Sequence, residues 1–442
     1  MRVVQRNDAA YEQARRSTMW NANVPERFPD EVIYASNAED VMAAVKRAKE
    51  HGLTVGVRSG GHGWSGNHVR DGGILLDLSA MTKYSIDKQN MTAIVEPALS
   101  GSILLTKLMK ENLFFPVGHC KGVGLGGYLL QGGFGWNGRA LGLACESILA
   151  IDYVDADGNL CHATETENAE ILWAARGAGP AFFGVIVKFH LRIYPKPAFF
   201  GSEYVQYPIN RLEEVVRWID RIGSSVPNSV ELQFMISRNP SFPPLLCKFM
   251  RGPVVIEMSA TVLAESKSAA QSDLEFFQSR PKSARFKLPL AQQPFGLISD
   301  GIMQHYPDKT NWQTDNLWTH AGADELLPHL QRIVATMPEA PSHMLWLNWA
   351  PNRVRKSMAF SKEDRTYLGF YGAWNKSDNG AVSTQWARSH VAAMQEFSTG
   401  VQFADDPGRA AEGLSHEAKM KLETLRAKHD PVGRFHRWIG DV

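Results

Sequence analysis

The stretch that most constrains this chain is residues 57–66, which read V-R-S-G-G-H-G-W-S-G. Four of its last seven residues are glycines, and each would cost a helix about 1 kcal/mol relative to alanine, so the stretch is not helical. Glycines suit a loop that enters left-handed backbone conformations and exposes its N–H groups, and such a loop binds anions, typically phosphates. Before it, the residue patterns predict a helix over 38–51 and a strand over 53–57. The chain therefore begins with a β-α-β unit that leads into a phosphate-binding loop.

Residues 118–139 form a second glycine-rich stretch, G-H-C-K-G-V-G-L-G-G-Y-L-L-Q-G-G-F-G-W-N-G-R. Its first glycines, followed by Glu146, fit the dinucleotide-binding pattern of a Rossmann fold, so an NAD(P)-dependent dehydrogenase is one alternative. A Rossmann turn leads into a regular helix, however, and here further glycines from Gly132 onward interrupt that helix. Cys120 opens this stretch and His62 lies inside the first one. Neither has the spacing of a metal site, so no metal is expected.

The two stretches resemble the motifs R-S-G-G-H-x-x-x-G and G-x-C-x-x-V-G-x-G-G-x-x-x-x-G-G-x-G of the berberine-bridge-enzyme-like flavin-linked oxidases. That group belongs to the vanillyl-alcohol-oxidase and p-cresol-methylhydroxylase (PCMH) superfamily. The resemblance implies an FAD with two covalent bonds, one from His62 to the 8α-methyl group and one from Cys120 to C6 of the isoalloxazine. Residues 170–187 also resemble a family stretch that lies along the adenine and ribose end of FAD. Further FAD contacts are thereby predicted at Arg58, Ser59, Gly60, Gly61, Gly63, Ser65, Gly118, Val123, Gly124, Gly126, Gly127, Gly133, Gly135, Asn137, Ile148, Gly184, Val185 and Ile186.

A length of 442 residues is too great for one ordinary hydrophobic core and predicts two or three lobes. The expected fold class is α+β. Residues 1–197 are expected to form a PCMH-type FAD-binding domain with two α/β subdomains, on which the polar residues 1–30 pack as an arm. Residues 198–414 alternate period-two strands with helical segments, which predicts a substrate-binding domain with a large antiparallel sheet covered by helices. Residues 415–442 begin with a helix and resemble the segment that returns to the FAD-binding domain.

Charge and composition exclude several classes of partner. The 47 basic residues nearly balance the 46 acidic ones, which argues against a nucleic-acid or anionic-membrane partner. No apolar run reaches the length of about 18 residues that a transmembrane helix needs. The N-terminus lacks the apolar core of a signal peptide, so a cytoplasmic location is expected. Four cysteines are too few for a disulfide framework.

The chemistry of the family requires a proton acceptor near flavin N5, where the hydride from the substrate arrives. Many relatives carry a tyrosine at the position of Phe403, which cannot accept a proton, and others carry an acid or amide where this chain has Gly369. Period-two alternation places Tyr367 and Tyr371 on the same face of the predicted strand as Gly369. The candidate catalytic residues are therefore Tyr371, Tyr367, Tyr306 and Asp405.

The sequence thus predicts an FAD-dependent oxidoreductase of secondary metabolism. Its substrate is expected to be a small organic molecule that is oxidised at an alcohol, an amine or a ring C–H by hydride transfer to flavin N5. Dioxygen is the expected electron acceptor. Besides the Rossmann dehydrogenase, a second alternative stays open: a flavin-bearing binding protein that has lost its catalytic base, as Phe403 and Gly369 suggest. The tryptophans of the second domain are as consistent with a site for a flat or hydrophobic substrate as with an ordinary hydrophobic core.

Overall fold

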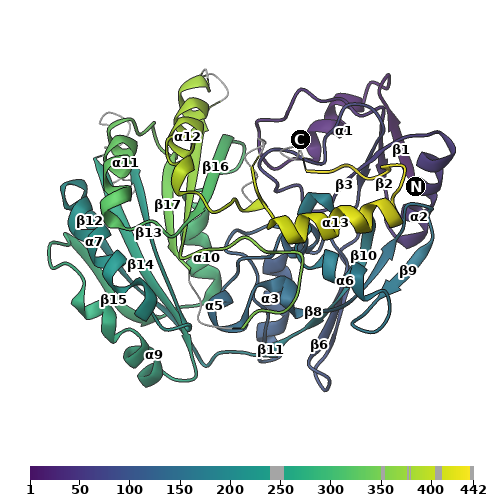
Figure 1. Cartoon of the computed structure of the whole chain (residues 1–442). Helices are drawn as coiled ribbons and strands as arrows, with labels where there is room; N and C mark the ends of the chain where they lie inside the picture. Colours follow the sequence, from purple (N-terminus) through teal and green to yellow (C-terminus); the bar gives the residue numbers. More distant parts are fainter. Residues whose placement is uncertain (239–252, 350–353, 376–377, 379, 404–410, 439–442) are drawn as a thin grey trace.

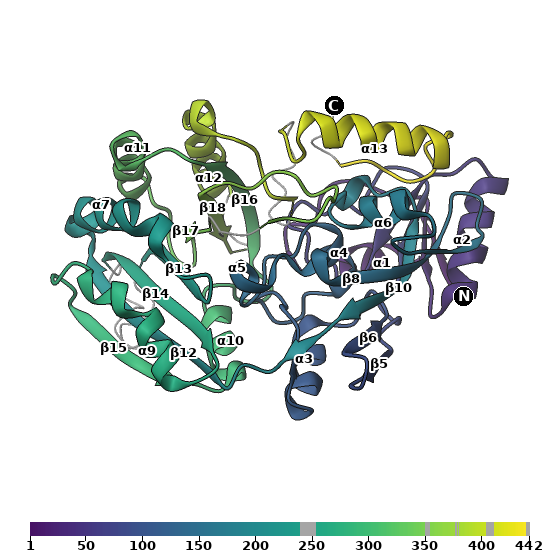
Figure 2. The same cartoon turned by 60° about the horizontal axis from the view of Figure 1, so that its bottom comes forward.

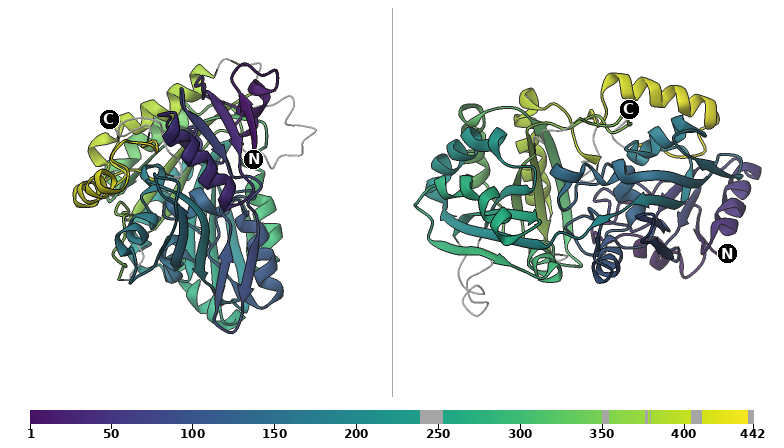
Figure 3. Two further views of the ribbon diagram at one scale, coloured as in Figure 1. Left: turned by 90° about the vertical axis from the view of Figure 1, so that its right-hand side faces the viewer. Right: turned by 90° about the horizontal axis from the view of Figure 1, so that it is seen from below.

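The computed structural model describes residues 1–238, 253–349, 354–375, 378, 380–403 and 411–438. Figure 1 shows two lobes side by side, with the first half of the chain in one and most of the second half in the other. The C-terminal helix α13 (His416–His429) crosses back and lies over the first lobe, as the other views also show (Figures 2 and 3). The fold is therefore the mixed α and β architecture that the sequence predicts.

The first lobe contains a four-stranded sheet in the order β1-β2-β4-β3, in which β2, β4 and β3 run parallel. Helix α2 (Ala38–Glu50) makes the crossover between β2 and β3 and begins where the Asn37 side chain accepts a hydrogen bond from the backbone N–H of Asp40. The N-terminal residues are not merely an arm, because β1 adds a strand antiparallel to β2 and is followed by α1 (Tyr11–Ser17). The strands of this sheet are β1 (Arg2–Gln5), β2 (Glu31–Tyr34), β3 (Val55–Arg58) and β4 (Ile74–Asp77).

The second sheet of this lobe has the order β5-β6-β10-β8-β9. Its strands are β5 (Tyr84–Asp87), β6 (Thr92–Val95), β8 (Ile148–Val154), β9 (Leu160–Ala163) and β10 (Val185–Arg192), and a separate pair joins β7 (Leu113–Phe114) to β11 (Tyr194–Pro195). Helices α3 (Gly101–Lys110), α4 (Leu125–Leu130), α5 (Gly138–Leu141) and α6 (Ala169–Ala175) complete the lobe. The second glycine stretch follows the two-residue strand β7 and enters a helix of only six residues. This arrangement excludes the Rossmann alternative.

The second lobe is built on a seven-stranded sheet in the order β15-β12-β14-β13-β17-β18-β16, and every neighbouring pair is antiparallel. One face packs against helices in a large apolar core that includes Leu232, Phe234 and Leu368. The strands are β12 (Phe199–Pro208), β13 (Val230–Arg238), β14 (Val254–Ala264), β15 (Phe286–Gln292), β16 (Asn311–Thr319), β17 (His343–Asn348) and β18 (Thr366–Trp374). The helices are α7 (Leu212–Ile222), α9 (Lys267–Asp273), α10 (Phe295–Met303), α11 (Ala323–Ala335) and α12 (Ala381–Ala393).

The chain after α13 is tied into the first lobe by hydrogen bonds. Phe435 forms a parallel bridge with Val55 at the start of β3, the strand that leads into the first glycine loop. The Arg434 side chain donates to the backbone oxygens of Leu53 and Ala156. Within the part of the chain that the structure describes, no helix has both the length and the apolar character needed to cross a bilayer.

A buried arginine joins the two lobes. Arg139 is 1% exposed and donates to four backbone oxygens of the second lobe, those of Val226, Pro227, Val230 and Trp349, at 2.5–3.1 Å. Burial lowers the pKa of Arg139 to about 10, so the guanidinium stays charged at neutral pH. Because removing one side of such a contact leaves buried polar groups unpaired, this arginine fixes the lobes relative to each other.

Candidate active site

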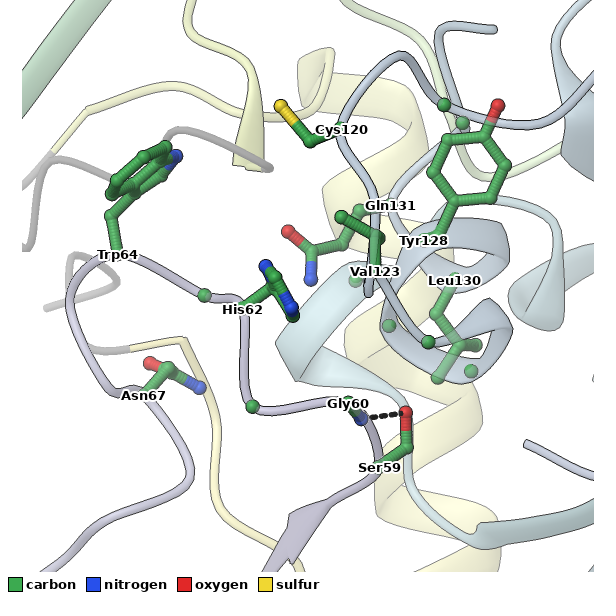
Figure 4. Close-up of a pocket in the computed structure, with 18 of the residues that line it drawn as sticks. Ser59, Gly60, His62, Trp64, Asn67, Cys120, Val123, Tyr128, Leu130 and Gln131 are labelled. Carbon is green, nitrogen blue, oxygen red and sulfur yellow. Dashed lines mark hydrogen bonds between the residues drawn. The ribbon is translucent and has the colours of Figure 1, made fainter. Parts of the chain in front are cut away.

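A cavity of about 410 Å³ lies between the two lobes, within the usual range of ligand pockets. The first lobe supplies the two glycine loops, and the second supplies one face of its sheet together with the end of α10. Alternation along β13 and β17 explains this wall, because Met235, Leu345 and Leu347 face the cavity while their neighbours face the helical core. Figure 4 shows His62 and Cys120 on the two loops that border this hollow.

The two glycine loops cross in close backbone contact. A Cβ atom built on Gly60 would lie 2.5 Å from the backbone nitrogen of Gly124, and one built on Gly124 would lie 2.8 Å from the Cα of Gly60. Neither position has room for a side chain, which is the physical reason for glycine at both. Next to this crossing, the Ser59 hydroxyl accepts a hydrogen bond from the backbone N–H of Gly60 at 2.7 Å (Figure 4). The crossing of the loops therefore fixes the loop of His62 relative to the loop of Cys120.

His62 is held as a neutral imidazole. Its ring stacks on Trp20 at 5.3 Å between centroids, and Trp20 in turn donates to the carboxylate of Asp308 at 2.8 Å. Burial, assisted by the charge of Arg58, lowers the pKa of His62 to about 4. A neutral imidazole has a nitrogen lone pair free for bond formation, so the environment of His62 suits a nitrogen nucleophile at neutral pH.

Cys120 packs into a small apolar cluster that both lobes build. The buried members of this cluster are Tyr306, Trp312, Tyr371 and Ala373, and Trp20, Trp64, Ile302, Met303 and Leu345 pack against it with Cys120. Asn21 ties the cluster together, since its amide donates to the backbone oxygens of Trp64 and Trp312. The N-terminal residues thus form part of the site, which the polar composition of this segment did not indicate.

Tyr306 is hydrogen-bonded to a histidine that the sequence motifs do not single out. The Tyr306 hydroxyl lies 3.1 Å from Nε2 of His343, and Nδ1 of the same ring lies 2.8 Å from the backbone oxygen of Pro341. A carbonyl oxygen only accepts, so Nδ1 carries the proton and Nε2 accepts from Tyr306. His343 is fully buried, and burial lowers its pKa to about 3, so it stays neutral near neutral pH. Its ring stacks on Tyr371, with centroids 4.7 Å apart.

Tyr367 and Tyr371 both line the cavity, as the alternation along β18 predicts. Gly369 lies between them, and a Cβ atom there would meet Tyr371 at 2.9 Å and Tyr367 at 3.0 Å. The two rings therefore occupy the space that a side chain at position 369 would fill. Tyr367 packs against Trp318, with ring centroids 5.1 Å apart, and lies in a different apolar cluster from Tyr371.

The structure brings most of the predicted site residues to the cavity. Among its lining are His62, Cys120, Arg58, Ser59, Gly60, Gly61, Gly63, Gly118, Val123, Gly124, Gly126, Gly127, Gly133, Gly184, Ile186, Tyr306, Tyr367 and Tyr371. Five others do not line it, namely Ser65, Gly135, Asn137, Ile148 and Val185. Asp405 lies outside the described residues. The role of each remains a prediction.

The cavity suits a flavin by shape and by its unmet polar groups. Three lining residues each have a buried polar atom without a hydrogen-bond partner within the described residues: Nε1 of Trp318, Oε1 of Gln402 and Nε2 of His436. They supply both donors and acceptors, whereas the rest of the lining is largely apolar and glycine-rich. An isoalloxazine has a flat apolar ring system with acceptors and an N–H donor at its edge, so these residues fit FAD.

One group of side chains could hold a metal ion, away from the cavity. Asp152 on β8 lies between His162 on β9 and His190 on β10, at 2.6 Å and 3.3 Å from the nearest ring nitrogens. Cys161, next to His162 in the chain, instead lies 3.7 Å from the carboxylate of Asp155. None of these residues lines the cavity, so the group is separate from the candidate active site.

Comparison with known proteins identifies the chain. The family model described as FAD binding domain matches residues 29–164. The chain is 33% identical to the uncharacterized FAD-linked oxidoreductase YvdP of Bacillus subtilis (strain 168), over 98% of this chain and 96% of the relative. It is 30% identical to the FAD-linked oxidoreductase nodO of Hypoxylon pulicicidum, over 96% and 94% of the two chains.

Solved structures show the same fold at low sequence identity. The structure of 6-hydroxy-D-nicotine oxidase from Arthrobacter nicotinovorans superposes with a TM-score of 0.85 at 19% identity, covering 98% of this chain and 96% of the other. A xylooligosaccharide oxidase from Myceliophthora thermophila C1, in complex with xylobiose, gives 0.84 at 20% identity, covering 99% and 96%. The chain is thus an FAD-dependent oxidoreductase and belongs to the berberine-bridge-enzyme-like family of the vanillyl-alcohol-oxidase and p-cresol-methylhydroxylase superfamily.

Proposed function

We propose that this oxidoreductase holds FAD through two covalent bonds, at His62 and Cys120, and oxidises a neutral, largely apolar alcohol. The observation that carries the proposal is that both residues line one cavity together with the candidate catalytic tyrosines Tyr306, Tyr367 and Tyr371. When bound, FAD supplies a hydride acceptor and passes the electrons on, with dioxygen as the expected acceptor. The chain itself must supply attachment, orientation of the substrate and a place for its proton.

Attachment uses two different nucleophiles. The neutral imidazole of His62 offers a nitrogen lone pair, and the thiol of Cys120 lies in the opposite loop. Two bonds from opposite loops fix a ring system that would otherwise be held only by contacts in an open cleft. C6, the expected partner of Cys120, neighbours N5 in the isoalloxazine. The residues packed around Cys120 are therefore those we expect nearest to the reacting carbon of the substrate.

Tyr306 is the proton acceptor that this arrangement favours. Its own proton points to Nε2 of His343, and the residue lines the cavity in which a substrate hydroxyl would approach it. As the substrate is oxidised, its hydroxyl proton passes to the oxygen of Tyr306, and the proton of Tyr306 moves along its hydrogen bond to Nε2 of His343. The low pKa of His343 makes this charge transient, so the proton passes on from the site. The backbone oxygen of Pro341 then holds the charged imidazole through Nδ1–H.

The lining favours an uncharged and mostly apolar substrate. Among the described residues that line the cavity, and leaving histidines aside, Arg58 is the sole charged side chain. It is paired with Asp77 at 3.1 Å on the first lobe. An amine substrate would need a carboxylate, and an oligosaccharide such as that of the xylooligosaccharide oxidase would need several partners for its hydroxyls. The wall formed by Met235, Leu345 and Leu347 supplies no carboxylate, and the polar side chain that β13 adds to the lining is Gln233.

Two measurements test the proposal separately. Acid-precipitated protein should remain yellow, and its intact mass should exceed that of the bare chain by one FAD. Colourless precipitate would overturn the covalent attachment. Anaerobic mixing with cinnamyl alcohol, benzylamine and xylobiose, followed through the flavin absorbance, tests the substrate class. Bleaching by the alcohol alone supports it, and bleaching by xylobiose or the amine with no response to the alcohol overturns it.

A further inference from the structure

Cys120 is flanked in the chain by two residues that pair with acidic side chains of the other lobe. His119, directly before it, places Nε2 at 2.7 Å from the carboxylate of Glu231 on β13. Lys121, directly after it, forms an ion pair with Asp300 on α10. The second lobe therefore contacts the loop on both sides of Cys120, the residue proposed to bind the flavin through its sulfur.

The two contacts differ in strength because they differ in burial. Glu231 is 5% exposed, and its second oxygen accepts the backbone N–H of Asn137 at 3.2 Å. The His119 ring also packs on Trp136, with centroids 4.1 Å apart. The side chains of Lys121 and Asp300 are 39% and 64% exposed, and surface pairs of this kind contribute little. Glu231 is therefore the anchor, and Asp300 offers a matched comparison.

The segment around Cys120 lies between two points at which the backbone is hydrogen-bonded, Val117 and Val123, and it has no regular structure of its own. Cys120 lies in no helix or strand, and Gly118 and Gly122 stand two residues to either side of it, the latter at φ +85°. Glycines leave a backbone free to adopt many conformations unless contacts fix it. Directly before the cysteine, His119 contacts the buried carboxylate of Glu231.

We propose that Glu231, acting through His119, is the positioning residue that aligns Cys120 for its bond to the flavin, so that the second lobe controls the second attachment. This inference rests on the proposed bicovalent attachment. In that step the carbon–sulfur bond forms at C6, the thiol proton and the C6 hydrogen leave, and two electrons pass to dioxygen, which becomes hydrogen peroxide. A misplacement of about 1 Å can slow such a reaction on the order of a hundredfold, so an anchor of this kind decides whether it occurs.

The test is Glu231→Gln beside Asp300→Asn. Both replace a carboxylate by an amide, but His119 and the backbone N–H of Asn137 contact different oxygens of Glu231, and in glutamine one of these positions becomes an NH2 group that does not accept. After denaturation and alkylation, peptide masses show whether Cys120 carries flavin or the alkylating reagent, and whether His62 carries flavin. We expect Glu231→Gln to form the Cys120 bond on the order of tenfold or more slowly while keeping the His62 bond. Asp300→Asn should match the wild type.

The outcomes separate the inference from the function on which it rests. A wild-type protein without flavin on Cys120 overturns the bicovalent proposal itself. A wild-type protein with that bond, beside a Glu231→Gln protein that forms it at the same rate, overturns the inference alone. If Glu231→Gln is insoluble, His119→Phe takes its place, because phenylalanine keeps the packing on Trp136 and removes the N–H donor. A normal Cys120 bond in that variant again refutes the role of the anchor.

Discussion

Acid should destabilise this protein through His343, and the size of the effect follows from its burial. Burial, helped by the nearby charge of His305 and opposed by the hydrogen bond to Pro341, lowers the pKa of His343 from 6.5 to about 3. The unfolded chain therefore binds more protons than the folded one over this range. The stability that depends on neutral His343 is complete above the unfolded pKa and is lost as the pH falls from there toward 3. Each pH unit corresponds to about 1.4 kcal/mol, so at about pH 5 the loss is about 2 kcal/mol.

Urea unfolding of the wild type and of His343→Gln, at about pH 7.5 and about pH 5, measures this term. Other groups titrate in both proteins, so the informative quantity is the difference between the two acid-induced losses of stability. We expect the variant to lose about 2 kcal/mol less than the wild type on acidification, even though it is less stable at both pH values. Leu368→Ala is the matched control. It removes buried apolar surface at a cost of about 2–5 kcal/mol and should leave the pH dependence unchanged.

Equal losses in the wild type and in His343→Gln would refute the reasoning. That result would mean that the imidazole is protonated in the folded state and that Nε2 does not accept from Tyr306. The proposed transfer of a proton from Tyr306 to His343 would then be ruled out, even if the enzyme were active.

Four further substitutions test the site. Tyr306→Phe should lower the rate of flavin reduction by an alcohol on the order of 10²–10⁴-fold with unchanged flavin content, whereas Tyr371→Phe should retain most of the rate, as stopped-flow measurements can show. Gly369→Ala places a Cβ atom 2.9 Å from Tyr371, so it should cost about 1–3 kcal/mol in thermal unfolding and also slow flavin reduction; an unchanged melting temperature contradicts this crowding. Gly124→Ala should separate the glycine loops at Gly60, and covalent flavin content, read from the intact mass, should fall; full incorporation would show that the crossing can open.

The parts of the fold that the sequence predicts well are those set by neighbouring residues. Alternation along β18 places Tyr367 and Tyr371 toward the cavity, with Leu368 and Phe370 in the core under the helices. The pleat of a strand has a period of two residues whatever surrounds it, so the direction of each side chain follows from the local pattern. The asparagine cap of α2 and the end of the short helix α4 follow equally from local chemistry.

The parts that the sequence does not predict depend on partners far away in the chain. The two-residue period of a strand places the His343 side chain on the same face as Leu345, so the sequence could predict which way it points. Its partner Tyr306 lies 37 residues away, and no spacing rule connects the two. His119 and Glu231 are 112 residues apart. Such pairs exist only once the chain is folded, within the second lobe for Tyr306 and His343 and between the lobes for His119 and Glu231, and neither member has a neighbour that marks it.

The replaced catalytic positions gain a physical explanation from this assembly. Phe403 is 3% exposed and packs edge-to-face on Trp438 at 4.8 Å, so the position where many relatives carry a tyrosine has become part of a small apolar core. A flavin-bearing binding protein that had merely lost its base would leave the cavity without a directed proton acceptor. Here the chain just after α10 supplies Tyr306, and a buried histidine with a fixed tautomer orients its hydroxyl. A buried imidazole lowers the stability of the protein in acid. A protein that only stores or binds a flavin would gain nothing from such a group, so its presence beside Tyr306 favours the enzyme over the binding protein.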